Sequence, residues 1–233
     1  MSLFIYFILY TINCHLKMNK FKFALLLSCV VLLSSCKVQK IDEKFYNEKT
    51  VGVAVQVLPE IVDINSQRPG VFSLDYQKKY SDILDQVKVK DFEEDLNKLI
   101  VDKLESKNKK YKFIDYFEYN DLSKFKSRNP DRLKEYSRRE LRNFKKSHNI
   151  DEIIVLRVQY GIGVSITQIG LVLVTGGFNY RNEIVNLEDN SLYQRKFKTV
   201  GERIKGQVTP EKAEFTINKA IEKGLEELAE IYK

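Results

Sequence analysis

The final third of the sequence sets three strand patterns directly before one long amphipathic helix, and this order limits the folds open to the chain. Residues 151–166, 170–189 and 191–200 are typical of β-strands, with a turn signal at 188–190. Residues 209–233 predict a helix, because Thr209 is a good N-cap and Pro210 suits the first helical position. One side of this helix is apolar at Ala213, Ile217, Ala220, Ile221, Leu225, Leu228 and Ile231. We therefore expect a helix packed on one face of a sheet.

Earlier residues add further strands and helices. A strand is predicted at 50–57, where valine alternates with small or polar residues, and another at 111–119. A helix is predicted at 91–107, where Asp91 and Glu94 form a pair like a capping box. Asn129 and Pro130 favour the start of a second helix at 129–149, with an apolar face of Leu133, Tyr136, Leu141 and Phe144. The segment 71–90 is ambiguous.

The predicted order is β-α-β-α-β-β-β-α within a single domain at 50–233. The expected fold class is α+β, an α/β sandwich in which helices pack mainly on one face of a mixed sheet. No internal repeat or low-complexity tract appears in the sequence.

The N-terminal residues 18–35 have the build of a secretory signal. Lys20 and Lys22 precede an apolar run from Phe23 to Leu33. This run is shorter than the roughly 20 residues that a membrane-spanning helix needs. Residues 1–17 add a second apolar run ahead of this signal, so we expect translation to start at Met18. The alternative is one long uncleaved anchor.

Residues Leu33-Ser34-Ser35-Cys36 resemble the lipobox of bacterial lipoproteins. The resemblance implies cleavage between Ser35 and Cys36, with lipid attached to Cys36. Lys37 stands where aspartate would retain such a lipoprotein at the inner membrane, so the resemblance favours the outer membrane. Residues 36–49 are polar and predict a tether. The element order of the mature domain is also similar to small α/β domains of the curli secretion lipoprotein and of the Tol-system periplasmic protein.

The charge of the mature chain is only moderately basic. The whole chain has 39 Lys and Arg against 32 Asp and Glu, and the predicted leader at 1–35 contains three lysines and no acid. Its removal leaves 39 − 3 = 36 cations against 32 acids, a small surplus. This surplus and the exported address give no reason to expect a nucleic-acid partner.

Catalytic and metal-binding patterns are sparse. Once the leader is removed, His148 is the only histidine, and the chain offers too few His and Cys ligands for an ordinary zinc site. Ser165 lies in a strand pattern without a nucleophile elbow. Asp115 and Glu118 alternate to opposite faces of a strand, so they do not converge as acid and base. We expect no cofactor, no metal and no enzyme activity.

A run of basic residues offers a candidate binding surface. The run also includes Arg128 and Lys134, and its candidate contact residues, on the polar side of the helix predicted at 129–149, are Arg132, Arg138, Arg139, Arg142, Lys145 and Lys146. Two interpretations stay open for this run, an ordinary solvated face and a contact with anionic head groups or an acidic partner.

The apolar run Leu171–Val174 predicts a core strand, with an exposed partner patch or a membrane-inserting hairpin as alternatives. The predicted function is a non-catalytic binding, scaffolding or assembly role in the cell envelope. The expected partners are the membrane, through the lipid, and an envelope protein, with homo-oligomers left open. The alternatives are an envelope hydrolase with a noncanonical carboxylate site and a subunit of an oligomeric outer-membrane secretion pore.

Overall fold

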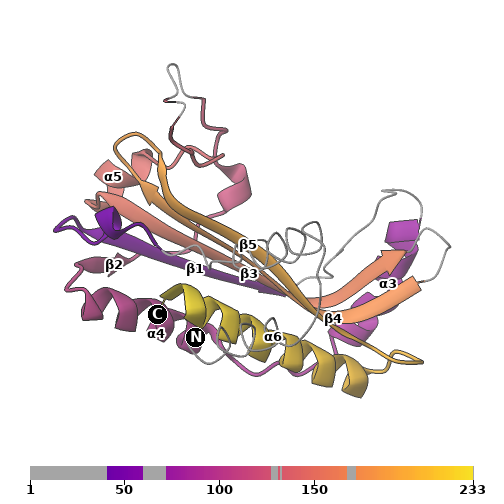
Figure 1. Cartoon of the computed structure of the whole chain (residues 1–233). Helices are drawn as coiled ribbons and strands as arrows, with labels where there is room; N and C mark the ends of the chain where they lie inside the picture. The colour runs from indigo at the N-terminus through magenta and orange to yellow at the C-terminus, as the bar shows by residue number, and fades with distance from the viewer. Residues whose placement is uncertain (1–40, 60–71, 127–130, 132, 167–171, 233) are drawn as a thin grey trace, which may run out of the picture. The chain divides into compact units, whose positions relative to one another are not determined.

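A five-stranded mixed sheet forms the centre of the domain (Figure 1). The computed structural model describes residues 41–59, 72–126, 131, 133–166 and 172–232. The strand order is β2-β1-β3-β4-β5, with β1 parallel to both β2 and β3, and with β4 antiparallel to both β3 and β5. The strands are β1 (Val51–Pro59), β2 (Tyr111–Phe113), β3 (Glu152–Ile166), β4 (Val172–Asn186) and β5 (Leu192–Arg203).

The helices pack largely on one face of this sheet, which confirms the predicted fold class. In Figure 1 the two long helices lie below the strands. The helices are α3 (Phe72–Leu84), α4 (Glu93–Ser106), α5 (Asn143–His148) and α6 (Pro210–Tyr232). Two single 3₁₀ turns, η1 (Glu43–Phe45) and η2 (Tyr119–Asp121), complete the elements of the described residues.

The apolar side of α6 packs on the central strands as the sequence predicts. Its buried apolar residues include Ile217, Ala220 and Leu228, and they meet Phe178 and Ile184 of β4 in one core cluster. Glycines let the two elements approach closely. A Cβ at Gly176 of β4 would overlap the backbone of Thr216 and Ile217, and one at Gly224 would overlap the Phe178 ring. The contact between α6 and β4 therefore depends on glycine as well as on apolar burial.

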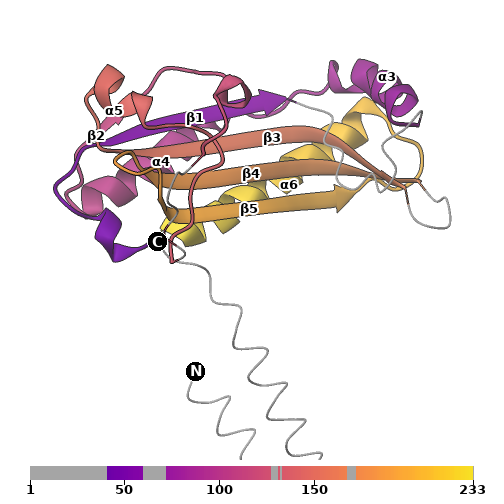
Figure 2. The same cartoon turned by 90° about the horizontal axis from the view of Figure 1, so that it is seen from above.

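The opposite face of the sheet is covered at one end by the chain between β2 and β3. Seen from above in Figure 2, this chain crosses the strands while α6 lies behind them. A second core cluster forms beneath it, with Ile114, Tyr119 and Leu141 against sheet residues such as Ile153 and Val155. The two clusters follow the alternation of β3, because neighbouring residues of a strand point to opposite faces.

The helix predicted at 129–149 is wrong for most of its length. Only Asn143–His148 is helical, and the described residues before it make non-local backbone bonds. The Phe125 N–H donates to the Arg138 carbonyl at 2.9 Å, and the Glu140 N–H donates to the Ser123 carbonyl at 2.8 Å. These bonds satisfy backbone groups that a helix would have paired locally, so tertiary contacts override the helical periodicity. The proposed start at Asn129 and Pro130 lies outside the described residues.

Smaller differences concern the order and length of elements. The ambiguous segment at 71–90 contains α3, so two helices rather than one separate β1 from β2. The strand predicted at 111–119 ends at Phe113, where its pairing with β1 stops opposite Val53. Residues 41–49, predicted as part of a tether, pack on the domain, because Ile41 and Phe45 belong to the core cluster below the sheet. The domain thus extends back at least to Ile41.

Candidate functional site on the open face of the sheet

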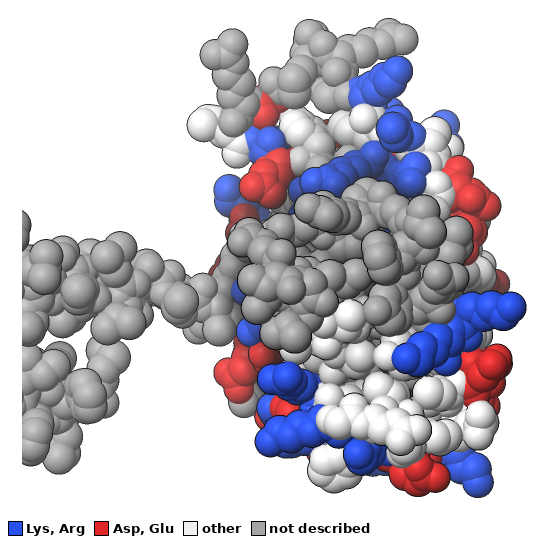
Figure 3. Space-filling view, turned by 90° about the vertical axis from the view of Figure 1, so that its right-hand side faces the viewer, with Lys and Arg blue, Asp and Glu red and all other residues white. Residues whose placement is uncertain are grey.

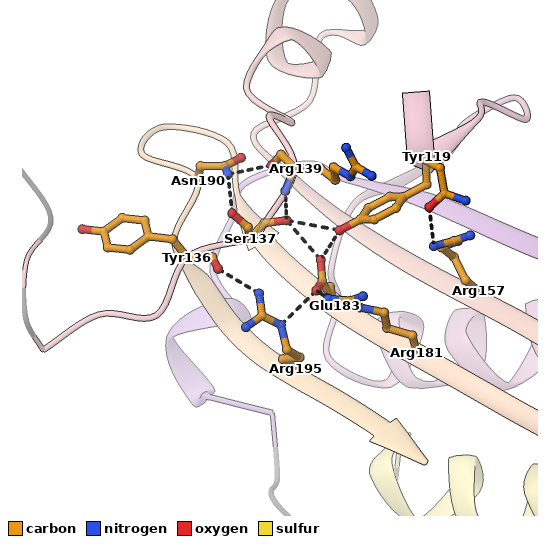
Figure 4. A network of polar contacts seen from close by, with 10 residues as sticks. Tyr119, Tyr136, Ser137, Arg139, Arg157, Arg181, Glu183, Asn190 and Arg195 are labelled. Atoms are coloured by element: carbon orange, nitrogen blue, oxygen red, sulfur yellow. Dashed lines mark hydrogen bonds and ion pairs between the residues drawn. The ribbon is translucent and has the colours of Figure 1, made fainter. Parts of the chain in front are cut away.

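A buried carboxylate organises the polar contacts on the face of the sheet away from α6 (Figure 4). Glu183 of β4 is 1% exposed. Its Oε1 accepts from Arg181 Nη2 at 2.9 Å and from Arg195 Nε at 2.9 Å. Its Oε2 accepts from the Tyr119 hydroxyl at 2.8 Å and from Ser137 Oγ at 3.1 Å. One side chain therefore joins two strands to the chain that crosses above them.

The strand register brings these charges together. Glu183 lies directly opposite Arg195 of β5, and Arg181 precedes Glu183 by two residues on the same face. Such opposite-charge neighbours on one face stabilise a sheet. Because Arg181 and Arg195 keep about a quarter of their side-chain surface exposed, at 27% and 25%, the pairs lie between a buried and a surface ion pair.

The contacts keep Glu183 ionised. Burial alone would raise the pKa of this carboxyl, but the positive charge of Arg181, the hydrogen bond from Tyr119 and the contacts with Arg195 outweigh it. The net result is a pKa below the ordinary value for glutamate. Burial and the nearby Glu183 charge raise the pKa of Tyr119, so its hydroxyl remains a donor. A carboxylate with both oxygens occupied in this way positions a surface and is not free to exchange protons with a substrate.

Asn190 fastens the same chain at a second point. Its Oδ1 accepts from the Leu141 N–H at 3.1 Å, and its Nδ2 donates to the Arg139 carbonyl at 2.9 Å. Asn190 has φ 65°, a backbone conformation that asparagine tolerates better than most residues. Close by, Arg195 Nη2 donates to the Tyr136 carbonyl at 2.8 Å. The residues 136–141 are thus held by side chains of the β4–β5 hairpin.

Arg157 lies beside this network and directly opposite Arg181 in the register of β3 and β4. Its guanidinium stacks over the Tyr119 ring at 4.8 Å, and its Nη1 donates to Asn120 Oδ1 at 3.4 Å. Like charges facing each other across two strands repel, and the bond from Arg181 to Glu183 offsets this cost. The open face is therefore rich in arginine close to the crossing chain.

The structure places the described members of the predicted basic run on a bent path and not along one helix. Arg139 is half-buried and its Nη1 donates to the Leu122 carbonyl at 2.7 Å. Arg142 makes a two-pronged contact with Glu140, with Nε and Nη2 at 2.8 and 2.7 Å from its oxygens. Much of the charge is therefore matched locally.

Of the remaining members, Lys145 contacts Glu188 and lies 3.8 Å from Asp151. Arg138 and Lys146 are exposed, and no ion pair is found for either within the described part of the chain. The predicted positions Arg132, Ser35 and Cys36 lie outside the described residues. Whether the run contacts a partner stays a prediction.

The other candidate residues are not brought together. His148 ends α5, where its Nδ1 lies 2.8 Å from Ser147 Oγ and its ring stacks on Phe144. Glu118 accepts from the Tyr116 hydroxyl at 2.8 Å. Ser165 pairs with Leu173 near the end of β3, eight residues beyond Arg157, whose guanidinium contacts Asn120. At about 3.3 Å per residue, this places Ser165 roughly 26 Å along the strand from the position that the segment with Glu118 contacts.

Sequence reasoning missed the Glu183 network. Tyr119 and Ser137 lie 64 and 46 residues from Glu183, so no local pattern links them. One signal was present: Arg181 and Glu183 alternate with apolar or buried positions in a strand, and period two puts both charges on one face. Charged residues on a buried strand face need partners, which is a reason to look for them.

A second buried ion pair holds the N-terminal segment on the domain. Lys109 Nζ lies 2.6 Å from Glu152 Oε2, and both side chains are fully buried. Lys109 Nζ also donates to Asn47 Oδ1 at 2.7 Å, and the Tyr193 hydroxyl donates to Glu152 Oε1 at 2.8 Å. The Phe45 ring lies 4.8 Å from the Lys109 ammonium. The chain that enters the domain is therefore fixed by both apolar and charged contacts.

Within the described residues, no group of three or more His, Cys, Asp or Glu side chains could hold a metal ion. No helix in this part of the chain combines the length and the apolar character needed to cross a bilayer.

Comparison with known proteins gives structural matches only. No protein family matches the sequence, and no curated protein does. A protein from Xanthomonas campestris is 10% identical, with 78% of this chain and 82% of that one covered and a TM-score of 0.35. A homolog of the neuraminyllactose-binding hemagglutinin from Helicobacter pylori is 12% identical, with 79% and 85% covered and a TM-score of 0.36. A lipoprotein from Neisseria meningitidis is 9% identical, with 78% and 99% covered and a TM-score of 0.26. These values mark distant likeness, so function has to be inferred from this chain's own residues.

Proposed function

We propose that this chain is a lipid-anchored protein of the bacterial cell envelope that binds or helps assemble another envelope component. The lipid is attached at Cys36 after cleavage behind Ser35, and the outer membrane is the proposed location. Partners are the membrane, through the lipid, and an envelope protein, which the folded domain binds without catalysis.

The short distance between the anchor and the domain carries this proposal. Ile41 is already buried in the core, and it follows Cys36 by only five residues. A fully extended chain of that length spans roughly 17 Å. The buried contacts of Phe45 and of the Lys109–Glu152 pair prevent the segment that follows from acting as extra tether. A lipid at Cys36 would therefore hold the domain against the bilayer surface.

The nature of the open face supports a binding role. The Glu183 network fixes the chain between β2 and β3 as a shaped surface, with its arginines and its carboxylate engaged in structural contacts. A surface built in this way can recognise another molecule without supplying an acid, a base or a nucleophile.

The anchor is tested by the Cys36→Ala variant in cells supplied with a labelled fatty acid. Loss of label and accumulation of the longer precursor are expected, because the resemblance assigns both lipid attachment and cleavage to this residue. Cys29→Ala is the matched control, since Cys29 lies within the predicted leader and should leave labelling unchanged. Label that persists in Cys36→Ala would overturn the proposed anchor.

The binding role is tested by crosslinking in native membranes. A reactive group placed at Asp121, which is exposed in the chain between β2 and β3, should give a discrete crosslinked product of an envelope protein. A group at Lys98, exposed on α4, is the control for chance contacts. Equal products from both sites, or none from either, would count against a partner at this surface.

A further inference from the structure

The chain that crosses the open face contains a hairpin which projects from the sheet. We use the name basic hairpin for the described residues 123–126, 131 and 133–142. Its two sides are joined by the bond from the Phe125 N–H to the Arg138 carbonyl and by a bridge between Lys124 and Arg139. The Phe125 and Tyr136 rings stack at 5.6 Å and strengthen the pairing. In Figure 1 this part of the chain stands above the sheet, on the side opposite α4 and α6.

The basic hairpin has an excess of positive charge. Its described carboxylates are Asp131, Glu135 and Glu140, and its six cations are Lys124, Lys126, Lys134, Arg138, Arg139 and Arg142. Contacts with Asp189, Glu140 and a backbone carbonyl occupy half of these cations. Lys124, Lys126 and Arg138 are exposed, and none has an ion pair with any other described residue. Figure 3 shows Lys and Arg side chains on the upper, projecting part of the molecule.

Leu133 is an exposed apolar side chain on the same hairpin. Its side chain is 95% exposed, more than that of any other exposed large apolar residue in the described part of the chain. A leucine left this open in a folded protein gains nothing from the core and gains free energy when a partner removes it from water. One exposed apolar side chain on a hairpin that also has exposed cations is a combination suited to the head-group layer of a membrane.

The position of the hairpin agrees with that partner. Its Tyr136 forms a bridge with Ser191, just before β5. On the other face of the sheet, the Phe45 ring lies 5.7 Å from the ring of Tyr193, near the start of the same strand. The chain thus enters the domain near the start of β5, at the end of the sheet where the basic hairpin is attached, but on the opposite face.

We infer that the basic hairpin is the surface with which the domain contacts the anionic head groups of the membrane that holds it. The inference rests on the proposed lipid at Cys36, because a tether of five residues keeps this end of the sheet near the bilayer. Lys124, Lys126 and Arg138 attract the anionic lipids, while Leu133 enters the boundary between head groups and acyl chains. This contact orients the domain so that the face covered by α4 and α6 does not touch the membrane.

The absence of tryptophan from the chain makes a direct test possible. Leu133→Trp places a single fluorophore on the hairpin, and Phe215→Trp places one on α6, where the native side chain is 68% exposed. Each lipidated full-length variant is reconstituted in vesicles of phosphatidylcholine and phosphatidylglycerol, with and without brominated acyl chains. The tryptophan at 133 should shift to shorter wavelength and lose fluorescence to the bromines, and the one at 215 should do neither.

Flotation of the vesicles separates failure of the inference from failure of the proposed function. If the protein floats but the tryptophan at 133 is not quenched, the hairpin does not contact the membrane and the inference is overturned while the anchor stands. Equal quenching at 133 and 215 would also overturn it, since the contact would then have no preferred surface. A lipid-labelled protein that does not float would overturn the anchor and the inference together.

A charge substitution tests whether anionic head groups are the partner. In the Leu133→Trp background, Lys126→Ala should lower the ratio of quenched to unquenched protein about fivefold, the effect expected for one lysine near an anionic surface. Lys98→Ala is the matched control, because Lys98 is an exposed lysine of α4 on the other side of the sheet. Replacing phosphatidylglycerol by phosphatidylcholine should remove the difference between the two variants. An equal effect of both substitutions would refute the charge contact.

Discussion

The two faces of the sheet are covered in contrasting ways. The face toward α4 and α6 is covered by regular helices whose buried residues are almost all apolar. The face toward the basic hairpin is covered at one end by irregular chain, held by a small apolar cluster and by the Glu183 network. The first arrangement gains its free energy mainly from burial, and the second needs specific polar partners in addition. This difference predicts that substitutions on the two faces will fail in different ways.

The largest effect is expected where α6 meets β4. In Gly176→Ala the added Cβ would overlap the backbone of Thr216 and Ile217, which cannot turn aside as a side chain can. We expect unfolding to become easier by about 3 kcal/mol or more, measured by urea denaturation, because the whole helix has to shift. Gly201→Ala in β5 is the control, since Gly201 is exposed and its substitution should change little. If both variants changed the free energy of unfolding equally, the contact between α6 and β4 would not depend on the glycine at 176.

A smaller and more local effect is expected on the opposite face. Glu183→Gln keeps the shape of the side chain but leaves Arg181 and Arg195 without their carboxylate. We expect a loss of about 2 kcal/mol, less than for a fully buried pair because both arginines reach solvent. Hydrogen exchange should increase at residues 136–141 before it increases in α6. Glu188→Gln, which removes an exposed partner of Lys145, should leave the exchange of these residues unchanged; uniform acceleration in both variants would contradict a local role for Glu183.

Acid should also affect the two faces of the sheet differently, because Glu183 lies on only one of them. The pKa of Glu183 is lower in the folded protein than in the unfolded chain, because Arg181, Arg195 and Tyr119 outweigh the effect of burial. A depressed carboxyl pKa contributes stability that is complete above the unfolded value of about 4.3 and is lost as the pH falls through the folded value. The protection of residues 136–141 against hydrogen exchange, relative to the rate of an unfolded chain at the same pH, should therefore fall below about pH 4 in the native protein. This loss of protection should be weaker in Glu183→Gln, and an identical pH profile in both proteins would rule out Glu183 as its source.

The contrast also explains how far the sequence alone predicts this fold. The strands around Val53, Ile154 and Phe178 and the helix α6 follow from local periodicity, since burial against one layer repeats every two or every 3.6 residues. The chain that crosses the open face between β2 and β3 does not follow from local periodicity. Its helix-like spacing at 133–144 is overridden by distant partners such as Ser191 and Asn190, which no local pattern announces. The candidate basic residues could be predicted as a group, but their pairing with Glu140 and Glu188 depends on the path of the chain.

The smallest effect distinguishes buried from exposed polar contacts on the open face. Lys134 Nζ lies 2.8 Å from Asp189 Oδ2, with 48% and 34% of the two side chains exposed, so water competes with this pair. In Lys134→Ala we expect the urea midpoint and the hydrogen exchange at 136–141 to stay within error of the native protein. Raised salt should not change this result, because there is little charge interaction to screen. If the variant instead loosened 136–141 as much as Glu183→Gln does, the hairpin would be held by its surface charges. The assignment of its stability to the buried carboxylate would then have to be abandoned.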